Sequence, residues 1–332
     1  MRPAPQYAMK ALLCKSFGPP ESLILEDIEL PGPGKGQVLI DVKACGVNFP
    51  DTLIIEGKYQ FKPPLPFAPG GEVAGIVSKT GEEVTHLKPG DRVFSLTGWG
   101  GFAEQALGDA NKTLLMPPGM DFVTAASVMY TYGTSYHALK QRAALQPGET
   151  LLVLGAAGGV GLAAVQLGVL MGAQVIAAAS TEEKLAVCRE MGAVKTINYT
   201  TEDLRERLKI LTDGQGVDVC YDPVGDRYTE PALRSMAWRG RYLVVGFAAG
   251  EIPKLSANLV LLKGCSLVGV FWGQFAALEP EQSGQNFHEL LRFIAEGKLK
   301  QHIHATYSLA EAAQALRDLL DRKVISKAVV MV

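Results

Sequence analysis

The stretch that most constrains the fold is an apolar run followed by glycines, LLVLGAAGGVG at residues 151–161. An apolar run bounded by glycine predicts a buried strand and a tight turn, and the small residues that follow, to Gly168, predict a helix. The glycine spacing, with alanine at the first position, is typical of turns that let a dinucleotide's pyrophosphate approach the backbone. A second apolar run, residues 174–179, follows where the ribose end of such a cofactor lies. The sequence therefore predicts a dinucleotide site, whose turn residues are Ala157, Gly158, Gly159, Val160 and Gly161; the alternative is an ordinary glycine-rich turn.

Length and composition favour a two-domain soluble protein. A chain of 332 residues exceeds the usual limit of one core. A net charge of −2 offers no electrostatic footprint for nucleic acid or an anionic membrane, and no apolar stretch reaches the length of a membrane span. Residues 1–7 carry no signal pattern, and the five cysteines are odd in number and scattered. We expect free thiols and a cytoplasmic location.

The chain changes character twice. Residues 8–125 contain short alternating runs separated by Pro/Gly turns, which predict a barrel-like β domain. From Thr131, where a helix to Ala144 is expected, strands and helices alternate to Phe271, as in a doubly wound parallel sheet. The pieces after Phe271 do not extend that sheet. We therefore predict one domain of residues 1–129 and 272–332, and a second of residues 130–271.

Three motifs carry a family resemblance. They are GETLLVLGAAGGVGLAAVQ at residues 148–166, ACGVNFPD at residues 44–51 and PGGEVAG at residues 69–75. From about Met9 to Val332, the chain resembles the zinc-free medium-chain dehydrogenases/reductases of the quinone oxidoreductase (ζ-crystallin) group. The resemblance implies an α/β protein with a GroES-like β-barrel catalytic domain and a Rossmann NADPH-binding domain. One departure, Val169 in place of a basic residue, lies on the helix and not on the phosphate turn.

The resemblance and the donor chemistry both point to a catalytic site without metal. In zinc alcohol dehydrogenases, the positions of Asn48 and Gly71 carry a cysteine and a histidine ligand. Asparagine and glycine supply neither thiolate nor imidazole. His302 and His304 share one side of a predicted strand, but no carboxylate or cysteine stands at ligand spacing, so we expect surface histidines.

Asn48 and Tyr59 are the predicted catalytic residues. The Asn48 amide suits a substrate carbonyl or a cofactor ribose, although asparagine also satisfies backbone groups in turns. The Tyr59 phenol suits a developing oxyanion, and its alternative is packing on neighbouring prolines. We expect Asp51 to cap the helix that follows it. The resemblance places Thr134 near the nicotinamide, with a plain first-turn helix hydroxyl as the alternative.

The residues after the second apolar run predict the choice of cofactor. The acidic residue that binds the ribose 2′-OH in NAD enzymes falls on Ala179. The resemblance implies that Ser180, Lys184 and Tyr199 receive the 2′-phosphate of NADPH; the alternative makes Lys184 a solvated charge beside two glutamates. The resemblance implies further cofactor contacts at the ends of the last two strands, although those residues could equally be core. It also implies one from a C-terminal lysine, before which Ser326 replaces the usual glycine. These residues are Gly246, Phe247, Val270, Phe271 and Lys327.

The predicted reaction is hydride delivery from NADPH to an electron-poor acceptor, because no Lewis acid is expected to assist alcohol oxidation. Quinones and α,β-unsaturated carbonyl compounds qualify. One alternative is a 2-enoyl thioester reductase of the acyl-CoA type, and another is a crystallin-like structural protein that binds NADPH without turnover. The apolar edge strand 266–271 predicts a homodimer or homotetramer.

Overall fold

The structure is a computed structural model that describes residues 6–332. It divides into two compact units, Met1–Tyr130 with Gln301–Val332, and Thr131–Lys300. Within the described part, no helix is both long and apolar enough to cross a membrane. The prediction that no address signal is present concerns residues 1–7, and residues 1–5 lie outside the described part.

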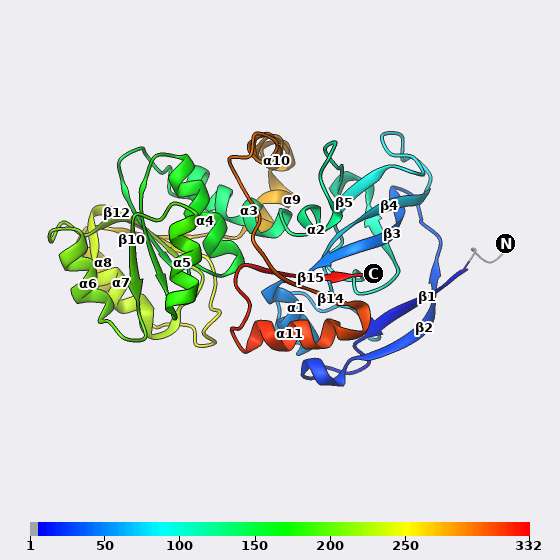
Figure 1. The fold of residues 1–332 in the computed structure, drawn as a ribbon, viewed down its shortest axis with the longest axis horizontal. Helices are drawn as coiled ribbons and strands as arrows, with labels where there is room; N and C mark the ends of the chain where they lie inside the picture. The colour runs from blue at the N-terminus through cyan, green and yellow to red at the C-terminus, as the bar shows by residue number, and fades with distance from the viewer. Residues whose placement is uncertain (1–5) are drawn as a thin grey trace. The chain divides into compact units, whose positions relative to one another are not determined.

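The second unit is built on a six-stranded sheet in the order β10-β9-β8-β11-β12-β13, with every pair parallel. From β8 the chain moves outward to β9 and β10, then crosses back to β11, so the order reverses between β8 and β11. Figure 1 labels β10 and β12 of this sheet and several of the helices around it. This is the predicted doubly wound sheet, in which ligands bind at that reversal. Its strands are β8 (Thr150–Leu154), β9 (Gln174–Ala179), β10 (Lys195–Asn198), β11 (Val217–Asp222), β12 (Met236–Val244) and β13 (Ser266–Gly269).

Helices cover this sheet through small or apolar contacts. A Cβ on Gly168 would lie 2.5 Å from Leu151 Cδ2, so glycine brings α4 (Gly159–Leu170) close against β8. One apolar core joins residues of three other helices to the sheet, among them Leu208, Leu233 and Leu259. These helices are α6 (Leu204–Leu211), α7 (Thr229–Arg234) and α8 (Ala257–Lys263), while α5 (Glu182–Glu190) packs on β9 and β10; η4 covers Asp226–Tyr228. The sequence analysis did not predict α8.

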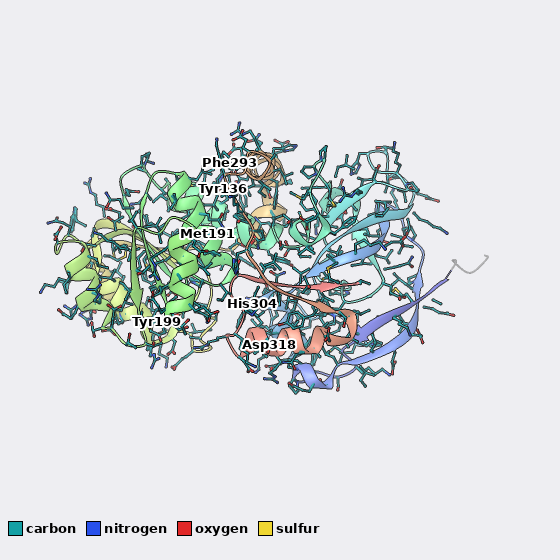
Figure 2. All side chains as sticks on the ribbon, viewed as in Figure 1. Tyr136, Met191, Tyr199, Phe293, His304 and Asp318 are labelled. Atoms are coloured by element: carbon teal, nitrogen blue, oxygen red, sulfur yellow. The ribbon has the colours of Figure 1, made fainter. Side chains whose placement is uncertain are left out.

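Residues 272–300 cluster with the second unit, whereas the sequence assigned them to the first domain. They form α9 (Trp272–Leu278) and α10 (Pro280–Ala295). His137 stacks on Phe275 at a centroid distance of 3.9 Å. Tyr136, whose hydroxyl donates to Glu289, also meets Phe293 edge to face at 6.5 Å (Figure 2). These contacts attach both helices to α3 (Met129–His137), which continues as a π-helical turn, Ala138–Arg142, rather than running as one α-helix to Ala144.

The first unit is mainly β, as predicted, and β3 is its central strand. β3 pairs with β4 along most of its length, with β6 over Gln37–Asp41, and with β15 over Ala44–Gly46. The larger sheet runs β14-β15-β3-β4-β5-β7, and β1 and β2 form a separate pair. The strands are β1 (Gln6–Leu13), β2 (Ile24–Pro31), β3 (Gln37–Gly46), β4 (Glu72–Thr80), β5 (Arg92–Leu96), β6 (Gln105–Asp109), β7 (Thr113–Leu115), β14 (Ile303–Ser308) and β15 (Lys327–Met331).

Two helices of the first unit fix the geometry around β3. Ile54 and Ile55 of α1 (Phe49–Ile55) share one core with Leu316 of α11 (Ala312–Leu320). Because β15 runs antiparallel to β3 with Val329 opposite Gly46, Lys327 comes to lie beside the residues that follow β3. The remaining short helices are η1 (Pro20–Ser22), η2 (Ala110–Lys112), α2 (Phe122–Ala125) and η5 (Leu309–Glu311).

Candidate active site

The turn between β8 and α4 has the geometry of a pyrophosphate cradle. Gly155 takes φ +56°, and the Gly158 N–H closes the turn on the Gly155 carbonyl at 2.9 Å. A Cβ on Gly161 would lie 2.2 Å from that carbonyl oxygen, so only glycine fits there. Gly158 is exposed at the N-terminus of α4, whose first N–H groups have no partner within the helix. Such N–H groups and the helix dipole suit a phosphate.

The predicted adenosine-end residues come together after β9. Ala179, 1% exposed, ends the strand and provides no carboxylate. Lys184 Nζ lies 3.4 Å from Ser180 Oγ, and the Tyr199 N–H donates to the Ala179 carbonyl at 3.2 Å (Figure 2 labels Tyr199). The structure thus brings Ser180, Lys184 and Tyr199 into one neighbourhood.

The glutamates beside Lys184 were the main objection to a phosphate site at this position. Glu182 forms an ion pair with Arg189, two turns further along α5, so its carboxylate is already compensated. Glu183 is exposed.

The residues that follow β12 and β13 lie at the carboxyl ends of the strands, as the glycine turn after β8 does. The Gly246 N–H lies 3.3 Å from the Asp222 carbonyl, and Phe247 is half-buried. Val270 is buried, while Phe271 is 57% exposed. Thr134 is half-buried on α3, next to Ser135, whose hydroxyl donates to the Val160 carbonyl in the phosphate turn at 2.7 Å. That bond places Thr134 one residue from a contact with the turn.

The first unit contains a buried cluster of charged and polar side chains around Asn48. Lys327 Nζ donates to Asn48 Oδ1 at 2.7 Å, to the Val47 carbonyl at 3.0 Å and to Glu72 Oε2 at 3.3 Å. Asn48 Nδ2 donates to Glu72 Oε2 at 2.9 Å and to the Gly46 carbonyl at 3.3 Å. Asn48 is 8% exposed, Lys327 2% and Glu72 0%. Both amide protons are therefore used, and Asn48 Oδ1 keeps one lone pair for another donor.

Glu72 and Asp51 each anchor a helix. Glu72 Oε1 accepts the N–H groups of Met129 at 2.6 Å and Tyr130 at 3.2 Å, so α3 begins at Met129 on a carboxylate from β4. The sequence analysis had begun this helix at Thr131, because a capping partner so distant in the chain leaves no local pattern. Asp51 Oδ2 accepts the Asn48 N–H at 2.8 Å in a capping box at the start of α1. The prediction that Asp51 precedes and caps this helix was wrong in position, because the helix already begins at Phe49 and Asn48 is its N-cap residue.

Burial raises the pKa of Asp51 to about 7, against its hydrogen bond from the Asn48 backbone and the charge of Lys327, both of which lower it. The Lys327 and Glu72 charges compensate each other at 3.3 Å. A protonated Asp51 therefore leaves the buried cluster neutral overall, whereas an ionised Asp51 leaves it with one uncompensated negative charge.

Tyr59 lies close enough to this cluster to feel the Asp51 charge. Burial, and then that charge, raise the pKa of the Tyr59 phenol above its usual value, so the phenol remains a proton donor at neutral pH. Its ring meets Phe61 edge to face at 5.4 Å, and Phe61 meets Trp99 at 5.8 Å. Tyr59 thus begins a row of aromatic side chains, the outer two of which are about two-fifths exposed.

The donors around Asn48 do not suit a zinc ion. A Cβ on Gly71 would lie 2.8 Å from the Gly98 carbonyl, so no imidazole fits at that position. Burial raises the pKa of the Cys45 thiol well above its usual value, which disfavours a thiolate ligand. The Lys327 ammonium already supplies the positive charge that Glu72 requires. Across residues 6–332, no group of three or more His, Cys, Asp or Glu side chains is placed to hold a metal.

Comparison with known proteins decides the family. The model of the alcohol dehydrogenase GroES-like domain matches residues 34–118, and that of the zinc-binding dehydrogenase matches residues 159–296. The quinone oxidoreductase-like protein 2 homolog of Nematostella vectensis is 40% identical, over 99% of this chain and 90% of that protein. The chain belongs to the quinone oxidoreductase family. This oxidoreductase therefore has the predicted fold and family, although the second family model is named for zinc binding and the donors at Asn48 and Gly71 do not suit that metal.

Solved structures of this family agree in fold. Quinone oxidoreductase of Pseudomonas syringae pv. tomato DC3000 has a TM-score of 0.92 and 33% identity, over 98% of this chain and 100% of that one. Escherichia coli quinone oxidoreductase, solved in complex with NADPH, has a TM-score of 0.89 and 31% identity, over 98% of this chain and 99% of that one.

The sequence analysis missed how Glu72 joins the site. Its signal was present, because an acidic residue at the start of the apolar strand 72–77 must find a buried partner. Lys327 was considered only as a cofactor contact, and its bonds from Nζ to Asn48, Val47 and Glu72 were not foreseen.

Proposed function

We propose that this quinone oxidoreductase family member transfers hydride from NADPH to a quinone or to an α,β-unsaturated carbonyl compound without a catalytic metal. The observation that carries the proposal is the buried Lys327. Its ammonium bonds Asn48, which stands where zinc alcohol dehydrogenases have a cysteine ligand, and also bonds Glu72. The glycine turn fits a pyrophosphate, and Ala179 with Ser180 and Lys184 fits a 2′-phosphate rather than a free 2′-OH.

The chain's own residues would bind the cofactor, orient it, and donate a hydrogen bond to the acceptor. When bound, NADPH supplies the hydride. Lys327 and Glu72 fix the Asn48 amide, so Asn48 Oδ1 would act as an acceptor, suited to a ribose hydroxyl. Because both Asn48 amide protons are used, the donor to the developing negative charge of the acceptor would be the Tyr59 phenol. The Tyr59 pKa, raised by burial, keeps that phenol protonated.

An assay of NADPH oxidation separates this proposal from its alternatives. Quinones, enones and acyl-CoA enoyl thioesters are offered to the purified protein, with and without a chelator. We expect turnover of quinones or enones that the chelator does not reduce. Faster turnover of enoyl thioesters identifies a thioester reductase, and NADPH binding without turnover of any acceptor identifies a crystallin-like protein. A matched Tyr59→Phe variant should lower kcat while leaving NADPH binding unchanged, because it removes only the phenolic proton donor.

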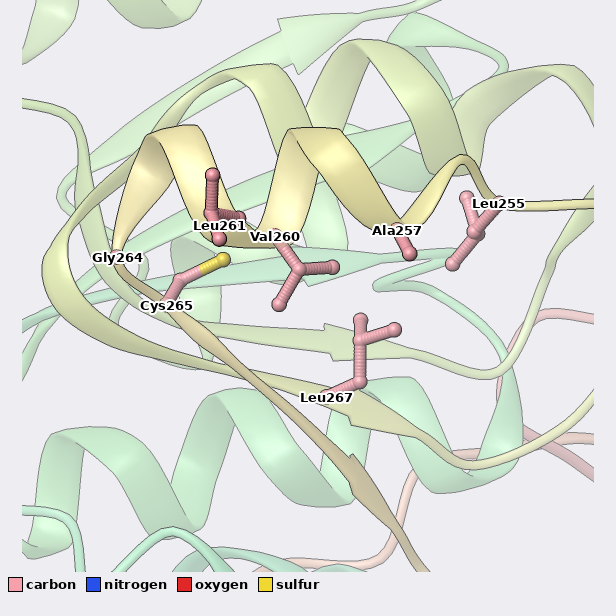
Figure 3. A pocket seen from close by; sticks show the side chains of 7 residues that line it. All are labelled: Leu255, Ala257, Val260, Leu261, Gly264, Cys265 and Leu267. Carbon is pink, nitrogen blue, oxygen red and sulfur yellow. The ribbon is translucent and has the colours of Figure 1, made fainter.

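We also propose that the protein forms a homodimer or homotetramer through the edge of its second unit. β13 pairs only with β12 within the described sheet, so its other edge presents unpaired backbone groups. Beside it, apolar side chains of α8 and β13 line an open groove (Figure 3). Leu261 is 77% exposed and Leu267 41%, although both are apolar. A second copy paired along β13 would cover both the edge and these side chains.

A cytoplasmic location completes the proposal. The five cysteines are all free and buried, and none is paired in a disulfide. Free thiols are usual in a reducing compartment. Fractionation of the native source, with the protein recovered from the cytosol, would support this location.

A further inference from the structure

The loop that follows β11 is held rigidly against the glycine turn. Asp222 Oδ1 accepts the N–H groups of Val224 and Gly225, each at 2.8 Å, and its other oxygen accepts the Tyr242 hydroxyl at 2.6 Å. A Cβ on Gly155 would lie 2.7 Å from Val224 Cγ2. The start of this loop therefore borders the turn that fits the pyrophosphate.

The far end of the same loop reaches the adenosine-end residues. The centroids of the Tyr228 and Tyr199 rings lie 4.4 Å apart, and the Tyr199 N–H donates to the carbonyl of Ala179. Arg227 lies over the Tyr228 ring, with its guanidinium carbon 5.1 Å from the ring centroid, and donates to the Tyr228 hydroxyl at 3.0 Å. Arg227 is exposed, so its remaining N–H groups can reach a ligand.

These contacts bring a second cation toward the neighbourhood of Lys184. Lys184 and Ser180 follow β9, whereas Arg227 follows β11, and the contact between the Tyr199 and Tyr228 rings joins the two segments. Of the acidic side chains nearby, Glu182 is paired with Arg189, Glu183 is exposed, and the charge of Asp226 acts on Arg227.

We propose that Arg227 binds the 2′-phosphate of NADPH together with Lys184 and Ser180. This inference rests on the proposed function, in which NADPH is the cofactor. An arginine fork makes two parallel bonds to a phosphate, whereas a lysine acts as a point charge. The Tyr228 ring and hydroxyl hold the guanidinium in place before the cofactor arrives, so little side-chain freedom is lost on binding.

Binding of two nucleotides to the full-length protein tests this role. Adenosine 2′,5′-bisphosphate carries the 2′-phosphate, and 5′-AMP lacks it. By calorimetry, Arg227→Gln should weaken binding of adenosine 2′,5′-bisphosphate about tenfold and leave 5′-AMP binding unchanged, as expected for the loss of one exposed charge-assisted contact. Arg227→Lys should lose less, because the charge is retained. Lys209→Gln, which removes one exposed charge from the last turn of α6, is the matched control and should bind both nucleotides as the wild type does.

The outcomes separate the inference from the proposed function. If wild-type protein binds the two nucleotides equally, the proposed NADPH site itself is wrong. If the wild type discriminates but Arg227→Gln binds both nucleotides normally, or weakens both alike as an adenine-stacking residue would, the assignment of Arg227 to the 2′-phosphate is overturned while the NADPH site stands.

Discussion

Replacing Lys327 by methionine should strongly destabilise the first unit. The Lys327 side chain is 2% exposed, and its ammonium makes three hydrogen bonds, to Val47, Asn48 and Glu72. Methionine fills most of the same volume but leaves the fully buried Glu72 carboxylate without its counter-charge. Removing one partner of a buried ion pair costs about 3–5 kcal/mol. With an m value of about 3 kcal/mol/M, the urea midpoint should fall by roughly 1 M or more.

Urea unfolding followed by intrinsic fluorescence measures this loss, with two comparisons. Lys323→Met removes a lysine that is 59% exposed and paired with Asp318 and Asp321, and should leave the midpoint nearly unchanged. Adding Glu72→Gln to Lys327→Met should recover part of the lost stability, because the uncompensated charge is removed. A Lys327→Met protein that loses less than about 1 kcal/mol would show that the buried pair does not have the role assigned to it.

Three further predictions concern pH, the cofactor and assembly. The folded-state pKa of Asp51, about 7, exceeds its usual value, so between about pH 4 and 7 the folded chain holds a proton that the unfolded chain has lost, and the free energy of unfolding should fall across that range by at most about 1.4 kcal/mol per pH unit. In urea titrations at several pH values, Asp51→Asn should flatten this slope, and an unchanged slope refutes the assignment. Lys184→Ala should raise the KM for NADPH about tenfold and leave that for NADH nearly unchanged, and Ala179→Asp should reverse the preference; equal harm to both cofactors contradicts the phosphate pocket. Leu267→Lys should dissociate the oligomer in sedimentation velocity, and a monomeric wild type at micromolar concentration would rule out the β13 interface.

The parts of the site that sequence could predict are local in the chain. The strand, turn and helix around Gly155 follow from apolar run length and glycine spacing, and the absence of a carboxylate at Ala179 is read directly from the strand end. A role for Asp51 at the start of a helix was also predictable, because its bond to the Asn48 N–H spans three residues, although that helix begins at Phe49 and not after Asp51.

The parts that sequence could not predict depend on contacts between distant residues. Lys327 meets Asn48 only because β15 pairs with β3, and the two residues are 279 positions apart. Residues 272–300 break the alternation of strand and helix, so their pattern gave no reason to group them with the sheet. Their place is decided by packing on α3, as in the stacking of Phe275 on His137.

The most direct test of the central claim is the initial rate of NADPH oxidation with a quinone, measured on protein samples whose zinc content is determined in parallel. The account predicts full activity in samples with far less than one zinc per chain, because Asn48 and Gly71 offer no ligands and Lys327 supplies the positive charge beside Glu72. An activity that rises in proportion to bound zinc, and is lost to a chelator, would contradict it.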